Sequence, residues 1–454
     1  MPEHCPVVPP APVWIFGCAG NRWRATLVSM SREIERSGRQ RILLLNQTFH
    51  PDVVATAQVL TDLAQEFARA GHDVTVITGR QGYDDPGLLF PRRERWEGIR
   101  IERVGVLALG KGARWRRALN FASFLAACAA RMALLPRQDL VVALTSPPLV
   151  ALLPALWTRV RGGRYAYWVM DLNPDEAVAA GWLRAGAPAE RLLSALSTHC
   201  LRNADPVIAL DRFMARRILD KGVCEERVVV QPPWPHDDRV RFDPEGRARF
   251  RAAHGLSDKW VVMYSGNHSP CHPLDTLLEV AKRMHGHAEF AFCFIGGGSG
   301  WAKVRDYRER HCLANITALP YEPPERLSAS LSAADLHAVV IGDPFVGLVH
   351  PCKIYNIIAL GTPFLCIGPR ENHVADLAAR LGDPRAARFA AHGDADAVER
   401  AIRESRDLAL RPDPMQNAAL MADISRSAAL ARLTAALLRE GHDRAAVVRS
   451  GPTG

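Results

Sequence analysis

The feature that most constrains this chain is a repeated alternation, from residue 41 onward, of short β-branched runs with amphipathic helical patterns. The run RILLLN (41–46) precedes a helical pattern over 55–70, for which Gly71 is the stop, and the strand pattern ending in DVTVITG follows. This order is a β-α-β unit. Its repetition predicts a parallel sheet covered by helices on both faces.

The strand patterns form two series. A segment rich in prolines and charges, 231–250, separates them, and the second series begins with WVVMYSG (260–266). We therefore predict two doubly wound, Rossmann-like α/β domains, over 39–235 and 236–412. Residues 1–38 are rich in proline and then basic, and we predict that they are a disordered extension or result from a mis-assigned start codon. Residues 441–454 are predicted to be a flexible tail.

Composition narrows the class of protein. Lys plus Arg number 57 against 48 Asp plus Glu, so the net charge of +9 favours an anionic partner, whether nucleic acid, acidic lipid or phosphorylated metabolite. The ten cysteines form no C-x-x-C pair, which suits a reducing cytoplasm and predicts neither disulfides nor zinc. The uncharged run 140–157 is broken by Pro147, Pro148 and Pro154, so no transmembrane helix is predicted.

Three loops of the second domain follow predicted strands: 265–273 (SGNHSPCHP), 296–300 (GGGSG) and 342–353 (GDPFVGLVHPCK). Glycine amides and helix amino termini suit a phosphate or diphosphate, although tight turns also use glycine. Trp301 stands where a dinucleotide fingerprint needs glycine, and no Walker lysine-serine pair occurs, which argues against a nicotinamide oxidoreductase and a P-loop NTPase.

Two charged residues stand out at strand ends. Lys353 lies in the first turn of a predicted helix, two residues after Pro351, which is a natural first helical residue. A lysine in that turn is unfavourable beside the positive end of the helix dipole, unless an anion binds there. The alternative is an ordinary exposed lysine. Asp171 follows the strand RYAYWVM and is predicted to be a cleft carboxylate, or else to tighten its loop. Asn173 is read as the following helix cap, with Asp175 and Glu176 as first-turn acids that have an ordinary dipole role.

Two further segments are second-rank candidates. His50 and Asp52 follow the first strand and could line the acceptor side of a cleft, although HPD can equally build a turn. The segment 111–137 joins cations with Trp115, Phe121 and leucines, which suits a helix resting on an anionic membrane surface. The alternative is a sheet-covering helix with a basic start.

The linker VVVQPPWPHDD, the loop YSGNHSPCHPLDTLLEVA and the run VGLVHPCKIYNIIALGTPFLCIGP together resemble glycosyltransferase family 4, in particular its WbuB-like polysaccharide-biosynthesis branch, over about residues 41–440. The resemblance implies the GT-B fold, with two domains facing across a cleft and a final helix, 413–440, packing back on the first domain. It also implies transfer of a sugar from a nucleoside-diphosphate donor with retention, without a metal or cofactor.

By the same resemblance, Asp171 contacts the sugar near its reacting carbon and Lys353 meets the diphosphate, as the two catalytic residues. The donor-binding residues are predicted to be Gly266, Asn267, His268, His272, Gly297, Gly298, Gly347, Leu348, Val349, His350, Pro351, Cys352 and Asn356. Backbone amides of 347–350 are expected to meet the sugar. Asn356 stands where the family has a ribose-binding glutamate, and Val53, Val54 and Ala55 replace a glycine pair after the first strand.

These features predict a cytoplasmic enzyme, with the inner face of the cytoplasmic membrane as an alternative location. It would extend a lipid-diphosphate-linked or free saccharide of an exopolysaccharide or lipopolysaccharide and bind no nucleic acid. No second carboxylate at nucleophile spacing stands out, which favours front-face displacement. Two alternatives remain at this stage: a GT-B sugar-nucleotide 2-epimerase and a non-catalytic, membrane-associated assembly protein.

Overall fold

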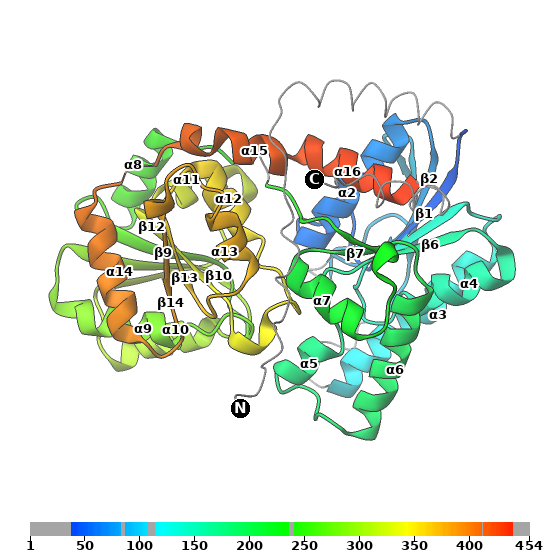
Figure 1. Cartoon of the computed structure of the whole chain (residues 1–454), viewed down its shortest axis with the longest axis horizontal. Coiled ribbons are helices and arrows are strands. Elements are labelled where there is room, and N and C mark those ends of the chain that lie inside the picture. The colour runs from blue at the N-terminus through cyan, green and yellow to red at the C-terminus, as the bar shows by residue number, and fades with distance from the viewer. Residues whose placement is uncertain (1–37, 83–86, 108–113, 236–239, 411, 439–454) are drawn as a thin grey trace, which may run out of the picture. The chain divides into compact units, whose positions relative to one another are not determined.

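The computed structural model describes residues 38–82, 87–107, 114–235, 240–410 and 412–438. The predictions for 1–37 and 439–454 therefore lie outside the described residues. The described residues from Arg41 on form one compact unit, which contains two sheets (Figure 1). Within the described part, no helix has the length and apolar character that a membrane crossing requires.

The first sheet has eight strands in the order β3-β4-β2-β1-β5-β6-β7-β8. Their bounds are Arg41–Leu45 (β1), Asp73–Gly79 (β2), Arg93–Trp96 (β3), Ile99–Val104 (β4), Leu140–Ala143 (β5), Arg164–Trp168 (β6), Val207–Ala209 (β7) and Val228–Val230 (β8). The prediction of a parallel sheet is wrong at one edge, because β3 pairs antiparallel with β4. The four residues of β3, RERW, are too short and too charged to register as a strand in the sequence, and the turn that joins it to β4 uses Glu97 and Gly98 at positive φ.

Helices cover both faces of this sheet, as predicted. Helices α3, α4 and α6 lie on one face, while α2 and α16 pack together on the other (Figure 1). The helix bounds are Ala55–Arg69 (α2), Arg114–Ala133 (α3), Leu152–Arg161 (α4), Asp175–Ala179 (α5), Pro188–Asn203 (α6), Arg212–Asp220 (α7) and Arg426–Leu438 (α16). Buried leucines of α16 belong to the same apolar core as β1 and β5, so this helix is part of the first sheet's domain.

The second sheet has six parallel strands in the order β11-β10-β9-β12-β13-β14. Their bounds are Trp260–Asn267 (β9), Phe290–Gly297 (β10), Ile316–Leu319 (β11), Leu336–Val340 (β12), Phe364–Ile367 (β13) and Ala387–Ala390 (β14). The helices are Pro244–Ala253 (α8), Asp275–Arg283 (α9), Trp301–Arg310 (α10), Leu327–Ser332 (α11), Lys353–Leu360 (α12), His373–Ala378 (α13), Ala395–Asp407 (α14) and Ala418–Ile424 (α15). The predicted α/β class with two parallel-sheet domains is thereby confirmed.

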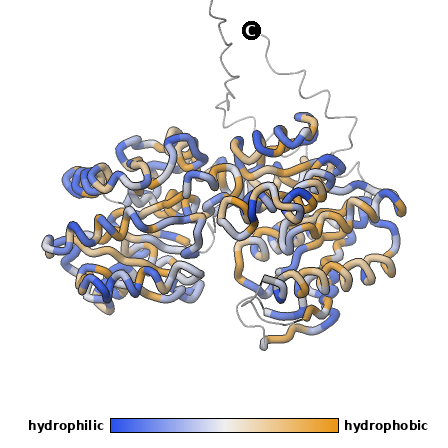
Figure 2. Tube along the Cα trace, turned by 90° about the horizontal axis from the view of Figure 1, so that it is seen from below, coloured by the Kyte–Doolittle hydropathy of each residue, from blue (hydrophilic) through white to orange (hydrophobic). Residues whose placement is uncertain are grey.

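The core of the second domain has two layers, one on each face of its sheet. Helices α9, α10 and α14 contribute to one layer, and α8, α11, α12 and α13 contribute to the other. Along the helices apolar and polar residues alternate, as expected for helices that turn only one side to a sheet (Figure 2). Because all six strands are parallel, their carboxyl ends and the three glycine-containing loops lie at the same edge of the sheet.

Candidate active site

The two loops that carry Asp171 and Lys353 are joined directly. The N–H of Leu172, after β6, donates to the carbonyl of Leu348, in the segment that leads into α12, at 2.8 Å. Arg217 of α7 also donates to the carbonyl of Val346 in that segment, at 2.7 Å. Residues about 180 positions apart in the sequence therefore meet at the carboxyl ends of two different sheets.

Asp171 is a half-buried carboxyl in this junction. Its N–H donates to the hydroxyl of Thr145 at 3.3 Å. Burial, together with the charge of Glu176, raises the pKa of Asp171 to about 7. The charge of this side chain also contributes to the raised pKa values of Cys271 and Cys352, which lie in loops of the second domain. Asp171 is thus a carboxyl beside the second domain, rather than only a loop-tightening residue.

Glu176 was missed by the sequence reasoning, which assigned it only a helix-dipole role. Its Oε2 accepts a hydrogen bond from Asn173 Nδ2 at 3.1 Å, and its Oε1 lies 3.8 Å from the thiol sulfur of Cys271. Burial raises the pKa of Glu176. The prediction that Asn173 caps the helix is wrong, because Pro174 occupies the cap position of α5 and the Asn173 amide binds the carboxylate instead.

Glycines let the loops after β9 and β10 approach backbone to backbone. The two strands stay in register to their ends, with Gly266 opposite Gly296 and Asn267 opposite Gly297. A Cβ on Gly296, whose φ is +141°, would lie 2.0 Å from the carbonyl oxygen of Gly266. A Cβ on Gly298 would lie 2.1 Å from Oδ1 of Asn267. These glycines are required by local packing, whatever ligand contacts they also make.

Lys353 is the first residue of α12, and its ammonium group is buried. The Nζ atom lies 3.5 Å from the centroid of the Tyr264 ring and close to Gly266, where a Cβ would be 3.0 Å away. Among the described residues this atom has no hydrogen-bond partner. Burial lowers the pKa of Lys353 to about 7. The alternative of an ordinary exposed lysine is therefore wrong.

Two histidines share the electrostatic environment of Lys353. Burial and the Lys353 charge lower the pKa of His268 to about 4 and that of His272 to about 3. Nδ1 of His272 lies 2.7 Å from the carbonyl oxygen of Val340, so this nitrogen carries the hydrogen and donates it. Both imidazoles are therefore neutral near pH 7, and the Lys353 ammonium has no hydrogen-bond partner among the described residues, so the positive charge that Lys353 carries when protonated suits an anionic ligand.

The segment around 347–350 makes specific contacts of its own. The N–H groups of Leu348 and Val349 both donate to the carbonyl of Phe345, at 2.9 and 3.2 Å. Two of the four amides that were expected to meet a sugar are thus already hydrogen-bonded. The thiol of Cys352 donates to the carbonyl of His350 at 3.2 Å, and the half-buried Asn356 follows Lys353 by about one turn of α12.

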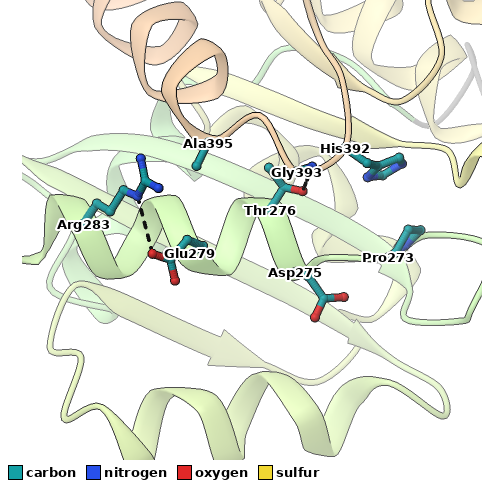
Figure 3. A pocket seen from close by; sticks show the side chains of 8 residues that line it. All are labelled: Pro273, Asp275, Thr276, Glu279, Arg283, His392, Gly393 and Ala395. Atoms are coloured by element: carbon teal, nitrogen blue, oxygen red, sulfur yellow. Dashed lines mark hydrogen bonds and ion pairs between the residues drawn. The ribbon is translucent and has the colours of Figure 1, made fainter.

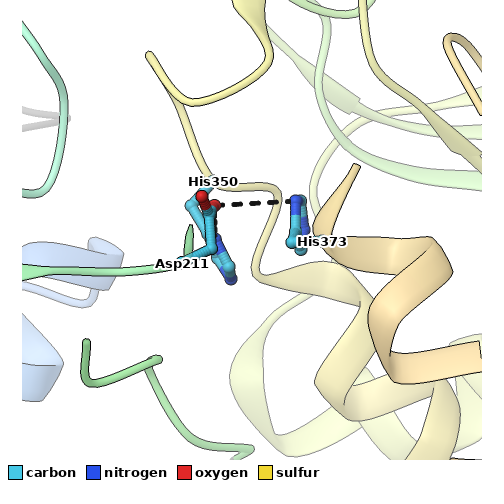
Figure 4. Close-up of side chains that lie close together, drawn as sticks. All are labelled: Asp211, His350 and His373. Atoms are coloured by element: carbon cyan, nitrogen blue, oxygen red, sulfur yellow. Dashed lines mark hydrogen bonds and ion pairs between the residues drawn. The ribbon is translucent and has the colours of Figure 1, made fainter. Parts of the chain in front are cut away.

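The His350 side chain contacts the first domain rather than the Lys353 site. Its Nδ1 lies 2.7 Å from Oδ2 of Asp211, and its Nε2 lies 2.8 Å from the Tyr355 hydroxyl. His373 stacks on the same ring, with centroids 3.8 Å apart (Figure 4). Although burial alone would raise it, the hydrogen bond from His350 and the two histidine charges lower the pKa of Asp211 to about 2.

Asp211, His350 and His373 each offer one ligand atom within 4.8 Å of the others, a spacing that could hold a metal ion. However, both ring nitrogens of His350 already face hydrogen-bond partners, and Asp211 also caps α7 by accepting from the N–H of Met214 at 2.8 Å. Hydrogen bonding accounts for Asp211 and His350 without a metal ion, whereas the buried Nε2 of His373 has no hydrogen-bond partner among the described residues. We assign the cluster to the junction between the two domains.

His50 and Asp52, the candidates for the acceptor side, lie in a turn, which was the alternative interpretation of the HPD sequence. The N–H of Asp52 donates to the carbonyl of Phe49 at 3.0 Å. The His50 ring stacks on Trp96 of β3, with centroids 4.0 Å apart, and its carbonyl accepts from Arg103 at 2.8 Å. These described contacts tie His50 to the β3–β4 hairpin.

A surface pocket of about 430 Å³ lies beside α9, outside the predicted site (Figure 3). It is lined by Pro273, Asp275, Thr276, Glu279, Arg283, His392, Gly393 and Ala395. Its charged side chains are already paired: Asp275 with Lys303, Glu279 with Arg283, and Arg283 with Asp396. We therefore assign it no role in the chemistry.

Comparison with known proteins finds similar sequences and a similar fold. Residues 16–234 match the profile of the glycosyl transferase 4-like domain. The putative colanic acid biosynthesis glycosyl transferase WcaI of Escherichia coli K12 is 24% identical over 336 residues, which cover 71% of this chain and 81% of WcaI. The probable glycosyltransferase WbjE of Pseudomonas aeruginosa is 25% identical over 231 residues, or 51% of this chain and 58% of WbjE. The crystal structure of Anabaena Alr3699/HepE with UDP superimposes with a TM-score of 0.64 at 13% identity, covering 87% of this chain and 99% of HepE.

Proposed function

This chain belongs to the family 4 glycosyltransferases and has their GT-B fold, and from that premise we propose that it moves a sugar, with retention, from a nucleoside-diphosphate donor to a lipid-linked saccharide during polysaccharide synthesis. The observation that carries the donor proposal is the buried ammonium of Lys353, which has no hydrogen-bond partner among the described residues. A buried cation without a partner is unfavourable, so an anionic ligand beside it gains binding free energy. HepE, which has a similar fold, has been solved with UDP and with UDP-glucose, which supports a uridine nucleotide as the first donor to test.

The reaction follows from the charges that develop. As the bond between the anomeric carbon and the diphosphate oxygen breaks, negative charge grows on the leaving phosphate and positive charge on the sugar. Lys353 stabilises the leaving phosphate, and no metal or cofactor is assigned to this task. Asp171, at the other side of the junction, stabilises the sugar cation. The acceptor oxygen bonds to the anomeric carbon on the same face, and its proton passes to the leaving phosphate oxygen.

Helix α3 supports a membrane location for the acceptor. One side of α3 covers the first sheet through Phe124, Cys128 and Met132, which are buried. The opposite side is also apolar: Trp115 is 60% exposed and Leu119 is 45% exposed, and a row of exposed alanines continues the stripe at 118, 122, 126, 129, 130 and 133. A helix with an apolar exposed stripe is expected to have a partner.

The charges around this stripe favour an anionic lipid surface as that partner. The sequence of α3 contains no acidic residue, and Arg116 is exposed beside Trp115. Helix α4, which contacts α3, adds exposed Leu156 and Val160 together with Arg159 and Arg161, and it also lacks acidic residues. Apolar side chains flanked by arginines match the boundary between headgroups and acyl chains. These features support our proposal that the enzyme works on the inner face of the cytoplasmic membrane, on a lipid-diphosphate-linked acceptor.

The test is a transfer assay with purified protein. Nucleoside-diphosphate sugars are screened for heat of binding, and those that bind are incubated with lipid-linked acceptors in vesicles. We expect one donor to give a product whose anomeric configuration, measured by NMR, matches that of the donor. Donor incubated alone should show no epimeric sugar nucleotide. An epimer formed without acceptor, or an inverted product, would contradict the proposal.

A further inference from the structure

The ammonium group of Lys353 lies over the face of a buried aromatic ring. Its Nζ atom is 3.5 Å from the centroid of the Tyr264 ring, and Tyr264 is fully buried. A cation is attracted to a ring face within about 6 Å of the centroid, and most strongly when water is excluded. Because the ammonium has no hydrogen-bond partner among the described residues, the ring face offsets part of the cost of burying its charge.

The local sequence brings the ring and the lysine together. Tyr264 and Gly266 are two positions apart in β9, so both lie on the same face of that strand. Gly266 has no side chain, and a Cβ there would lie 3.0 Å from Nζ and 3.1 Å from Cε of Lys353. The glycine therefore leaves the space through which the first residue of α12 reaches the tyrosine ring.

The ring itself is held by the end of β9 and by the loop that follows it. The Tyr264 hydroxyl donates to the carbonyl of Asn267 at 2.7 Å. Its ring stands nearly perpendicular to the ring of His268, with centroids 5.1 Å apart. Burial raises the pKa of Tyr264, so the ring stays neutral near neutral pH and its contact with Lys353 is not an ion pair. The tyrosine thus joins Lys353 to two neighbours that were predicted to bind the donor.

We propose that Tyr264 is a positioning residue, which holds the Lys353 ammonium by the face of its ring at the place where the donor diphosphate binds. This inference rests on the proposed function. A free lysine side chain has many rotamers, and a cation that is already placed loses less conformational entropy when an anion binds. The ring uses none of the three N–H donors of the ammonium, so all three remain available for phosphate oxygens.

The experiment measures UDP affinity by calorimetric titration. Tyr264→Leu removes the ring face and should weaken UDP binding by about 5- to 30-fold. Tyr264→Phe keeps the ring and should restore most of the affinity. Tyr307→Leu is the matched control, because this tyrosine belongs to α10 of the same domain and binds Glu279 instead, at 3.1 Å. If Tyr264→Phe binds UDP as weakly as Tyr264→Leu, the ring face is not what matters and the proposal fails.

A double-mutant cycle separates positioning from a general effect on folding. If the ring acts through the lysine, Tyr264→Leu should cause no further loss of UDP affinity in the Lys353→Met protein, although the loss is clear when Lys353 is present. Equal losses in both backgrounds would show that Tyr264 acts independently of Lys353, which would also overturn the proposal.

A last measurement needs neither a Tyr264 variant that folds nor a nucleotide. The chain has only six lysines, so NMR of lysine Cε–H groups gives few signals, and Lys353→Met assigns the relevant one. Protons above an aromatic face are shifted upfield, so the Lys353 ε protons should resonate upfield of the other lysines, and an unshifted signal would refute the contact. Failure of the proposed function looks different: a protein that shows this shift but binds no nucleoside diphosphate would have the contact without the assigned ligand.

Discussion

Nδ1 of His350 lies 2.7 Å from Oδ2 of Asp211, and this buried hydrogen bond joins the segment before α12 to the start of α7 in the other domain. Asp211 is the second residue after β7 and caps α7, so its position is set by the first sheet. His350 comes three residues before Lys353. The bond therefore fixes the start of α12, and with it the buried ammonium, relative to the domain that carries Asp171.

Asp211→Asn should destabilise the protein and weaken transfer. Removing the charge leaves His350 without its ionised partner, and the loss of a buried charged hydrogen bond costs about 2–4 kcal/mol of unfolding free energy. Urea denaturation measures the change. Arg212→Gln, which breaks the exposed ion pair to Asp376, is the control and should cost less than about 1 kcal/mol. An equal loss of unfolding free energy in the two variants would show that the Asp211–His350 hydrogen bond contributes no more to stability than an exposed ion pair.

Lys353→Met should weaken UDP binding by about 10- to 100-fold, because a hydrogen bond to a charged group contributes about 1.5–3 kcal/mol. Calorimetric titration with UDP measures the change. Lys282→Met, which removes an exposed lysine of α9, should leave the affinity unchanged. Unaltered UDP affinity in Lys353→Met would remove the basis for assigning the diphosphate to this lysine.

The stability of the ligand-free protein should depend on pH through the same lysine. Burial lowers the pKa of Lys353 from 10.5 to about 7. Between these values the unfolded chain binds this proton and the folded chain does not, so the free energy of unfolding rises with pH. The cost of burying the charge is full below about pH 7 and is gone above pH 10.5. Denaturation at several pH values should show a smaller slope in Lys353→Met than in the unaltered protein. A slope that the substitution does not change would indicate a normal lysine pKa.

Gly296→Ala should disrupt the loops after β9 and β10. The new Cβ would lie 2.0 Å from the Gly266 carbonyl oxygen and would force alanine to a φ of +141°, so the backbone must move. We expect a loss of more than about 2 kcal/mol in unfolding free energy, and weaker UDP binding. Gly286→Ala is the matched control, because a Cβ there has nothing within 4 Å. Similar melting temperatures for the two variants would contradict this account.

Charges placed on the exposed stripe of α3 should release the protein from anionic vesicles. Trp115→Glu combined with Leu119→Glu removes two exposed apolar side chains and adds repulsion from acidic lipid. We expect at least a tenfold loss of binding to phosphatidylglycerol vesicles in co-sedimentation, with UDP affinity unchanged. Met415→Glu is the control, since Met415 is 77% exposed outside α3. If both variants sediment like the unaltered protein, α3 does not contact lipid.

Local patterns predicted much of the fold and part of the site. Gly71 has a positive φ at the end of α2, as a helix stop requires. Asp171 and Lys353 could be found because strand ends in parallel sheets gather at one edge. The edge strand β3 could not be found, because it is only four residues long and three of them are charged. Its pairing with β4, which the sequence pattern does not indicate, supplies its hydrogen bonds.

The sequence by itself determined the alternation of strands and helices, the two domains and the loops at their strand ends, because hydrophobic periodicity and glycine positions act over a few residues. Only the tertiary structure decided which groups meet. Glu176 is an ordinary first-turn acid until Cys271 approaches from another domain, and Lys353 is an ordinary lysine until Tyr264 and Gly266 bury its ammonium group. Burial and charge pairing depend on neighbours that are distant in the sequence, so the chemistry of these side chains is fixed only when the chain folds.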